Sequence, residues 1–204
     1  MEIGCILLAG GRGSRFGKDK SWVEFGGQTL LQRAVSNLGF LSSEIVIVTA
    51  AGRELPELKT ASTLKVINDL TSNQGPLMGI YTGLVHSSFQ YNLVVACDMP
   101  FVNQELVEHM AGSAAGYDVV MPRIDLLKEP LHAVYARTCL GAIETMLARQ
   151  EFKIDSLLRL VKVRYVESDE IDRFDPRHTS FFNINQTADL EKAAELLVGE
   201  CRDS

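Results

Sequence analysis

A segment near the N-terminus combines backbone freedom with positive charge. Four glycines lie within eight positions: Gly10, Gly11, Gly13 and Gly17. Arg15 and Lys20 bring two cationic side chains to the same stretch. Glycines let the backbone turn and point its N–H groups at a bound group, and the cations neutralise phosphate charge. This pattern predicts a site for a nucleoside triphosphate.

Two familiar phosphate-binding motifs do not fit this segment. A P-loop ending at Lys18 requires glycine and Ser/Thr where Arg12 and Asp19 stand. The dinucleotide motif G-x-G-x-x-G, begun at Gly11, has Phe16 where its third glycine belongs. A tight turn with a solvated basic rim therefore stays open as the structural alternative.

A candidate metal ligand follows an apolar run. Asp98 comes directly after residues 93–97, and Pro100 ends the predicted strand. Magnesium commonly binds one or two carboxylates together with substrate phosphates and waters. We therefore expect Asp98 to bind Mg²⁺, with a helix-capping role as the alternative.

A further glycine-containing segment is suited to a flat base. Gly75 and Pro76 predict a turn, Leu77 continues into a helix, and Gly79 permits close approach of a base. Asp69 follows another predicted strand and is either a base- or ribose-reading carboxylate or a turn residue. A helix start with a packing glycine is the alternative.

Two asparagines lie near the C-terminus. Asn183 and Asn185 alternate along a predicted extended stretch, which sends both amides to one face. There they are candidates to complete a metal shell or to position the acceptor. Because Thr187 and Asp189 also form an ordinary helix start, a structural role stays open.

The elements that must position these residues alternate along the chain. Apolar runs rich in β-branched residues predict strands at 3–9, 45–49, 64–67, 93–97, 119–121, 131–135 and 161–166. Helical periodicity appears at 28–38, 77–86, after Asn103, at 138–149 and at 187–198. The alternation predicts a three-layer, doubly wound α/β fold with a mainly parallel sheet. Ligands bind at the carboxyl ends of such strands.

Composition narrows the class of protein. The 204 residues read as one unit over 1–204, and 46% of them are apolar. The 20 Lys+Arg against 26 Asp+Glu give a net charge of −6, which argues against a nucleic-acid polymer as partner. No stretch reaches the ~18 apolar residues of a membrane span. The four cysteines form no C-x-x-C pair, so we expect a cytoplasmic protein with reduced thiols.

The segments also resemble a known family, in order. Residues 8–20 resemble the opening signature of nucleotidyltransferases, and their Gly-Gly form ending in Asp19-Lys20 is most similar to molybdenum cofactor guanylyltransferases. Asp69, residues 75–80, Asp98 and residues 183–190 continue the resemblance. It implies a Rossmann-like nucleotidyltransferase fold. An N-terminal half would bind nucleotide and a C-terminal half the acceptor.

The resemblance implies specific roles. Catalysis falls to Lys20, Arg15 and Asp98, with Mg²⁺ on Asp98 and with Asn183 and Asn185 as acceptor or metal-shell residues. The implied nucleotide-binding residues are Leu8, Ala9, Gly10, Gly11, Gly13, Lys20, Asp69, Gly75, Pro76, Leu77, Gly79 and Asp98. Residues 129–135 match a strand beside the acceptor more weakly. An asparagine that touches the nucleotide in the family has no counterpart in residues 50–53.

The implied reaction transfers GMP from GTP to the terminal phosphate of molybdopterin. Because that phosphate is already ionised, no strong base is needed, and the four histidines are expected to be structural. Three alternatives stay open: a cytidylyltransferase acting on molybdopterin, a sugar-phosphate nucleotidyltransferase, and a non-catalytic nucleotide-binding assembly protein. The resemblance also implies transient contact with molybdoenzyme-assembly proteins and no membrane partner.

Overall fold

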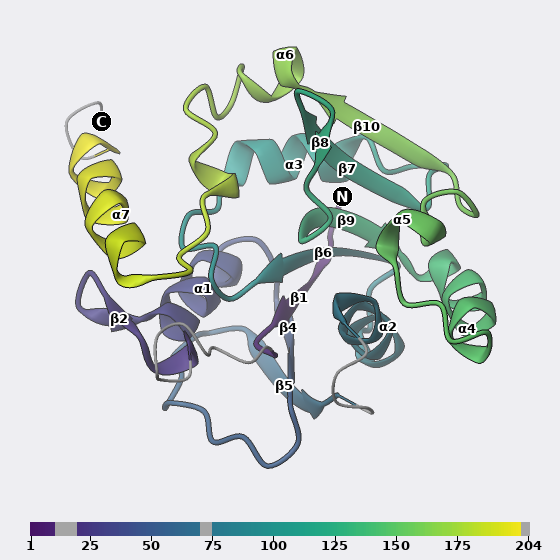
Figure 1. Cartoon of the computed structure of the whole chain (residues 1–204), viewed down its shortest axis with the longest axis horizontal. Coiled ribbons are helices and arrows are strands. Elements are labelled where there is room, and N and C mark those ends of the chain that lie inside the picture. The colour runs from purple at the N-terminus through teal and green to yellow at the C-terminus, as the bar shows by residue number, and fades with distance from the viewer. Residues whose placement is uncertain (11–19, 70–74, 201–204) are drawn as a thin grey trace.

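One mixed sheet organises the molecule (Figure 1). The computed structural model describes residues 1–10, 20–69 and 75–200. Within them the sheet runs β10-β7-β9-β6-β1-β4-β5, and β8 pairs with β7. The strands are β1 (Gly4–Leu8), β4 (Glu44–Thr49), β5 (Thr63–Asn68), β6 (Tyr91–Ala96), β7 (Val119–Ile124), β8 (Leu127–Lys128), β9 (His132–Ala136) and β10 (Val163–Glu167). A separate hairpin joins β2 (Glu24–Phe25) and β3 (Gln28–Thr29).

The strand directions bring several strand ends to one edge. β1 is parallel to β4 and β6, and β4 is parallel to β5. β9 runs antiparallel between β6 and β7, and β10 is parallel to β7. The mainly parallel sheet is confirmed, with β9 as an inserted antiparallel strand. The carboxyl ends of β1, β4, β5 and β6 therefore share an edge with the start of β9.

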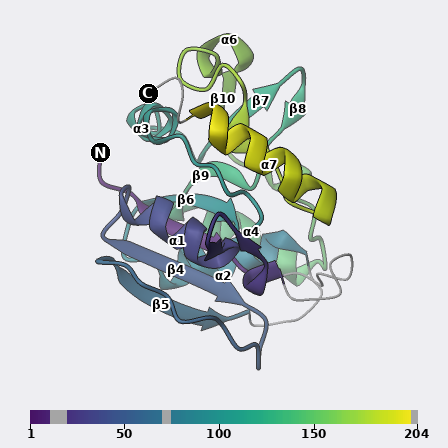
Figure 2. The same cartoon turned by 90° about the vertical axis from the view of Figure 1, so that its left-hand side faces the viewer.

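Helices cover both faces of the sheet, which confirms the three layers (Figures 1 and 2). The helices are α1 (Leu30–Gly39), α2 (Pro76–His86), α3 (Gln104–Gly112), α4 (Leu140–Ala148), α5 (Ile154–Leu157), α6 (Ser168–Ile171) and α7 (Thr187–Glu200). Cys5 and Leu7 of β1 face α1 and α3, whereas Ile6 and Leu8 face α2 and α4. This alternation is the period of a strand covered on both sides.

Local signals explain where the helices begin. The Thr29 hydroxyl accepts a hydrogen bond from the N–H of Gln32 at 3.1 Å, which caps α1. The Asn103 side chain does the same for α3, accepting from the N–H of Leu106 at 2.9 Å. Gly75 precedes α2 with a φ of +72°, a conformation that glycine adopts without strain.

A small apolar cluster outside the sheet joins the two ends of the chain. Val23 and Phe25 of the β2–β3 hairpin region pack with Phe101, with Ile184 and with Ala193 of α7. The Phe25 and Phe101 rings meet edge-on, with centroids 6.1 Å apart. The C-terminal segment is thereby held beside the loop that follows β6. None of the described helices combines the length and the hydrophobicity that a membrane-spanning helix needs.

Candidate active site

Backbone hydrogen bonds fix the ends of four strands against one another. The N–H of Cys97 donates to the carbonyl of Leu8 at 3.1 Å, and that of Ala9 donates to the carbonyl of Val48 at 2.9 Å. The N–H of Asp69 donates to the carbonyl of Thr49 at 2.7 Å. The sheet therefore carries Gly10, Asp69 and Asp98 to its carboxyl edge, where the sequence predicts ligand binding.

Three side chains from distant segments meet at this edge. The Lys20 ammonium donates to Asp98 Oδ2 at 2.7 Å and to Asn185 Oδ1 at 2.7 Å. The side chains of Lys20 and Asp98 are 20% and 19% exposed, so their ion pair is less screened than a surface pair. The structure thus brings together a cation, a carboxylate and an amide that the sequence assigns to one site.

Asp98 also has a buried oxygen that no hydrogen bond satisfies. Its Oδ1 is inaccessible to solvent and has no partner among the described residues. A buried carboxylate oxygen left unpaired is costly, and a bound cation would relieve that cost. Within the described ranges no group of three or more His, Cys, Asp or Glu side chains could hold a metal. A single carboxylate of this kind is a ligand that Mg²⁺ accepts, because Mg²⁺ commonly binds one or two carboxylates together with waters and substrate phosphates.

The segment around α2 approaches β1 closely. A Cβ on Gly79 would lie 3.0 Å from Leu8 Cδ2, so this glycine has a packing role. The side chains of Leu8, Ala9 and Leu77 are buried in the core. Any contact of these three residues with a nucleotide would therefore come from their backbone groups. Gly75 and Pro76 are exposed at the head of α2, and Gly10 is exposed after β1.

Asp69 is half-buried where β5 ends. The Thr82 hydroxyl of α2 donates to Asp69 Oδ1 over a long 3.4 Å. Thr82 is fully buried, so this contact ties the carboxylate to the second turn of α2. The contact orients the Asp69 carboxylate toward α2.

Sequence reasoning missed one cation at the edge. The Arg53 guanidinium donates through Nη1 to the carbonyl of Ala9, directly before the glycine-rich segment. Arg53 stands in the 50–53 segment that departs from the family pattern. Its position after the end of β4 was the available signal, because ligand contacts gather at such strand ends.

Not every predicted site residue joins this cluster. Gly11, Gly13 and Arg15 lie outside the described residues. Asn183 donates through Nδ2 to the carbonyl of Phe181 at 3.1 Å, within its own segment. Of the two asparagines, it is Asn185 that the structure joins to Lys20.

His132 is fully buried at the start of β9. Neither ring nitrogen has a hydrogen-bond partner among the described residues, and the ring meets Phe181 edge-on at 5.2 Å. Burial lowers the pKa of His132 to about 4, although the charge of Asp175 opposes this effect. The imidazole is therefore neutral at pH 7.

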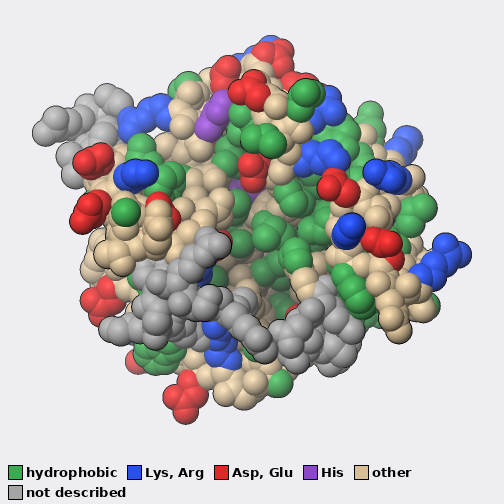
Figure 3. All heavy atoms as spheres, in the orientation of Figure 1, with side chains coloured by type: hydrophobic (Ala, Val, Ile, Leu, Met, Phe, Trp, Pro, Cys, Tyr) green, Lys and Arg blue, Asp and Glu red, His purple; other side chains and the backbone are tan. Residues whose placement is uncertain are grey.

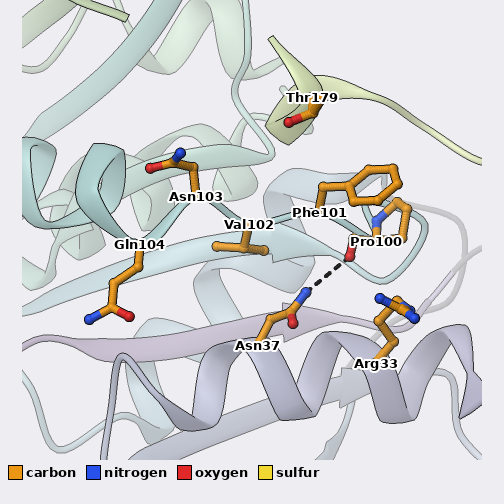
Figure 4. Close-up of a pocket in the computed structure, with 8 residues that line it drawn as sticks. All are labelled: Arg33, Asn37, Pro100, Phe101, Val102, Asn103, Gln104 and Thr179. Atoms are coloured by element: carbon orange, nitrogen blue, oxygen red, sulfur yellow. Dashed lines mark hydrogen bonds between the residues drawn. The ribbon is translucent and has the colours of Figure 1, made fainter. Parts of the chain in front are cut away.

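A small polar pocket lies behind the loop that follows Asp98 (Figure 4). Its volume is about 300 Å³, and its walls come from α1, residues 100–104 and Thr179. Asn37 of α1 donates to the carbonyl of Pro100 at 3.0 Å, and the Asn103 amide donates to the carbonyl of Phe174 at 2.8 Å. These contacts hold the loop from both sides.

The chain is similar to known proteins over most of its length. Residues 5–167 match the model of the MobA-like NTP transferase domain. A probable molybdenum cofactor guanylyltransferase of Pelotomaculum thermopropionicum is 37% identical over 188 residues, which cover 92% of this chain and 90% of that protein. A protein of the same name from Methanosarcina acetivorans is also 37% identical, over 96% of this chain and 91% of its own length.

Solved structures share the fold. The crystal structure of molybdopterin-guanine dinucleotide biosynthesis protein A from Archaeoglobus fulgidus has a TM-score of 0.79 and 30% identity, covering 97% of this chain and all of that one. A 2-C-methyl-D-erythritol 4-phosphate cytidylyltransferase from Thermus thermophilus has a TM-score of 0.69 at 18% identity, covering 96% and 98%, and supports the fold alone. The chain therefore belongs to the family of MobA-like NTP transferases, which are nucleotidyltransferases.

Proposed function

We propose that this chain transfers GMP from GTP to the terminal phosphate of molybdopterin and releases pyrophosphate. The meeting of Lys20, Asp98 and Asn185 at the carboxyl edge of the sheet carries the proposal. The names of the relatives that align over most of the chain support guanine as the base and molybdopterin as the acceptor.

The reaction needs alignment and charge neutralisation rather than a strong base. A phosphate oxygen of the acceptor forms a bond to the α-phosphorus of GTP, and the bond from that phosphorus to the pyrophosphate oxygen breaks. The acceptor oxygen is already ionised near pH 7. We propose that Lys20 exchanges its bond to Asp98 for the triphosphate and, with Arg15, neutralises the charge that develops. The backbone of Gly10, Gly11 and Gly13 is proposed to cradle the phosphates.

We propose that Asp98 holds Mg²⁺. Support comes from its buried Oδ1, which has no hydrogen-bond partner among the described residues, and from the divalent metal that nucleotidyltransferases of this family generally use. When bound, Mg²⁺ would neutralise phosphate charge at the site. Asn185 is the proposed neighbour of this metal, and Asn183 is a candidate acceptor contact.

We propose that the N-terminal half of the chain binds the nucleotide and the C-terminal half binds the acceptor. Gly75 and Pro76 are exposed at the head of α2 and would bind the nucleotide through backbone groups, and Asp69 would contribute its carboxylate. Gly79 packs on Leu8 and would serve the nucleotide site by letting α2 lie close to β1. Figure 3, compared with Figure 1, shows a hollow over β6 and β9 with hydrophobic side chains along it. Such a hollow suits a flat acceptor with a charged tail.

We further propose a cytoplasmic setting with brief contacts to molybdoenzyme-assembly proteins. The buried, unbridged thiols of Cys5 and Cys139 suit a reducing compartment. The net charge of −6 does not favour a nucleic-acid partner.

Pyrophosphate release with molybdopterin as acceptor tests the proposal. The purified chain is supplied with Mg²⁺ and, in separate reactions, with GTP, CTP or ATP. We expect release with GTP well above the other two. Preference for CTP would identify a cytidylyltransferase instead, and nucleotide binding without release would point to a non-catalytic protein.

A further inference from the structure

A buried carboxylate holds the segment that leads to Asn185. Asp175 is 3% exposed and accepts three hydrogen bonds. The backbone N–H and the hydroxyl of Thr179 donate to its Oδ1 at 2.9 and 3.1 Å, and the N–H of Ser180 donates to its Oδ2 at 2.8 Å. Both oxygens are used, so the carboxylate fixes the orientation of the short 3₁₀ turn Thr179–Phe181.

This turn is tied to the loop that carries Asp98. The Ser180 hydroxyl accepts from the N–H of Asn103 at 3.2 Å, and Asn103 is the residue that caps α3. Thr179 lines the same pocket as residues 100–104 (Figure 4). The turn therefore has a defined place relative to the end of β6.

A short stretch, residues 182–184, connects the turn to Asn185 and the reactive cluster. The N–H of Phe182 donates to the carbonyl of Thr179 at 3.0 Å, and the N–H of Ile184 donates to the carbonyl of Asp98 at 2.9 Å. Ile184 is fully buried, and the next side chain is Asn185, which accepts from Lys20. Because only three residues separate the turn from Asn185, a shift of the turn is passed along the chain to Asn185.

We propose that Asp175 is a positioning residue for the transfer reaction, acting through the Thr179–Phe181 turn to hold the Asn185 amide oxygen against Lys20. This inference rests on the proposed function. Asp175 itself makes its contacts with the turn and not with the cluster, so its effect on catalysis passes through Asn185. Displacements of about 1 Å at a reacting group can cost on the order of 100-fold in rate.

Steady-state kinetics of Asp175→Asn test the proposal. The amide keeps one acceptor oxygen and loses the other, so the turn loses at least one anchoring bond. We expect kcat to fall about tenfold, with a smaller change in KM for GTP. The matched control is Asp172→Asn in the preceding turn. That carboxylate is 55% exposed and pairs with His178, so kcat should stay within about twofold of wild type.

A double-mutant cycle separates positioning from general destabilisation. If Asp175 acts through Asn185, Asp175→Asn should cost less than about twofold in an Asn185→Ala background. Equal losses in both backgrounds would overturn the proposal, as would an unchanged kcat in Asp175→Asn. Thermal melting of each variant accompanies the kinetics.

A milder variant covers the case in which Asp175→Asn does not fold. Thr179→Val removes one bond to Asp175 and nearly preserves side-chain volume. It should lower kcat about two- to fivefold in the wild-type background and should not change the kcat of Asn185→Ala. Equal losses in both backgrounds, or no loss in the wild type, would overturn the inference. A wild-type chain without any transfer would instead overturn the proposed function.

Discussion

The two sides of the candidate site are built in different ways. On the side of β1, β4, β5 and β6, parallel strands in register deliver Gly10, Asp69 and Asp98 to a common edge. On the other side, residues 174–186 contain no strand. Asn185 is positioned there by carboxylates that accept backbone N–H groups. Asp189 does this beside Asn185, accepting its N–H at 2.8 Å. A sheet positions residues through many shared bonds, whereas the C-terminal segment depends on a few side chains.

The largest expected effect is on the sheet side. Asp98→Ala removes the carboxylate that pairs with Lys20 and that we propose to hold Mg²⁺. Transfer should fall by more than about 10³-fold, because charge neutralisation dominates this chemistry. Melting temperature should change little, because Asp98 lies in a turn beyond β6. Activity of Asp98→Ala near that of wild type would remove this carboxylate from the mechanism.

Loss of the cation should cost somewhat less. Lys20→Ala is expected to lower kcat by on the order of 10²–10³, the cost of deleting one preorganised charge or donor. Lys20→Arg serves as the control that keeps the charge. Lys20 bonds Asp98 on the sheet side and Asn185 on the C-terminal side, so Lys20→Ala removes a contact from both sides at once. A loss below threefold would show that the cluster is not the reacting centre.

Acid is expected to destabilise the fold through His132 of β9, whose ring packs edge-on against Phe181 of the C-terminal segment. The pKa of His132 is about 4 in the folded chain, and its ordinary value is 6.5. Between pH 4 and 6.5 the unfolded chain therefore carries a proton on His132 that the folded chain does not. His132 does not lower the free energy of unfolding above pH 6.5, but that free energy falls by about 3 kcal/mol as the pH drops from 6.5 to 4. Denaturant unfolding of wild type and His132→Leu across this range measures it. If the free energy of unfolding depends on pH equally in wild type and in His132→Leu, His132 is not the group responsible.

The smallest expected effect tests packing on the nucleotide side. A Cβ on Gly83 would lie 2.3 Å from Ile6 Cγ2, so Gly83→Ala should destabilise the fold by about 1–3 kcal/mol. Gly141→Ala in α4 is the matched control, because a Cβ there meets nothing within 4 Å. That change should stabilise by about 0.5–1 kcal/mol. Equal unfolding free energies for the two variants would mean that α2 does not pack on β1 this closely.

The same contrast explains how much could be predicted from the sequence. The seven predicted strands are all confirmed, because continuous β-branched runs are the pattern of a sheet covered on both faces. The direction of β9 was not predictable from its own residues, since an apolar run reads alike in both directions. The two-residue strands β2, β3 and β8 and the four-residue helices α5 and α6 are too short to show periodicity.

Site residues on the sheet side were easier to predict than those on the C-terminal side. Asp98 follows a buried strand, so its location at the carboxyl edge follows from topology. Alternation alone could not say which of Asn183 and Asn185 bonds Lys20, because neither lies in a paired strand. Asp175 carries no motif that distinguishes it from neighbouring acidic residues. Its role depends on a turn that is defined by tertiary contacts.

The most direct test of the central claim follows the α-phosphate of GTP. The wild-type chain is incubated with Mg²⁺, molybdopterin and GTP labelled at that phosphate. We predict that the label moves into a molybdopterin guanine dinucleotide, with one pyrophosphate released for each dinucleotide formed. Label that stays in GTP, or that appears only in free GMP, would contradict guanylyl transfer at the Lys20–Asp98–Asn185 cluster.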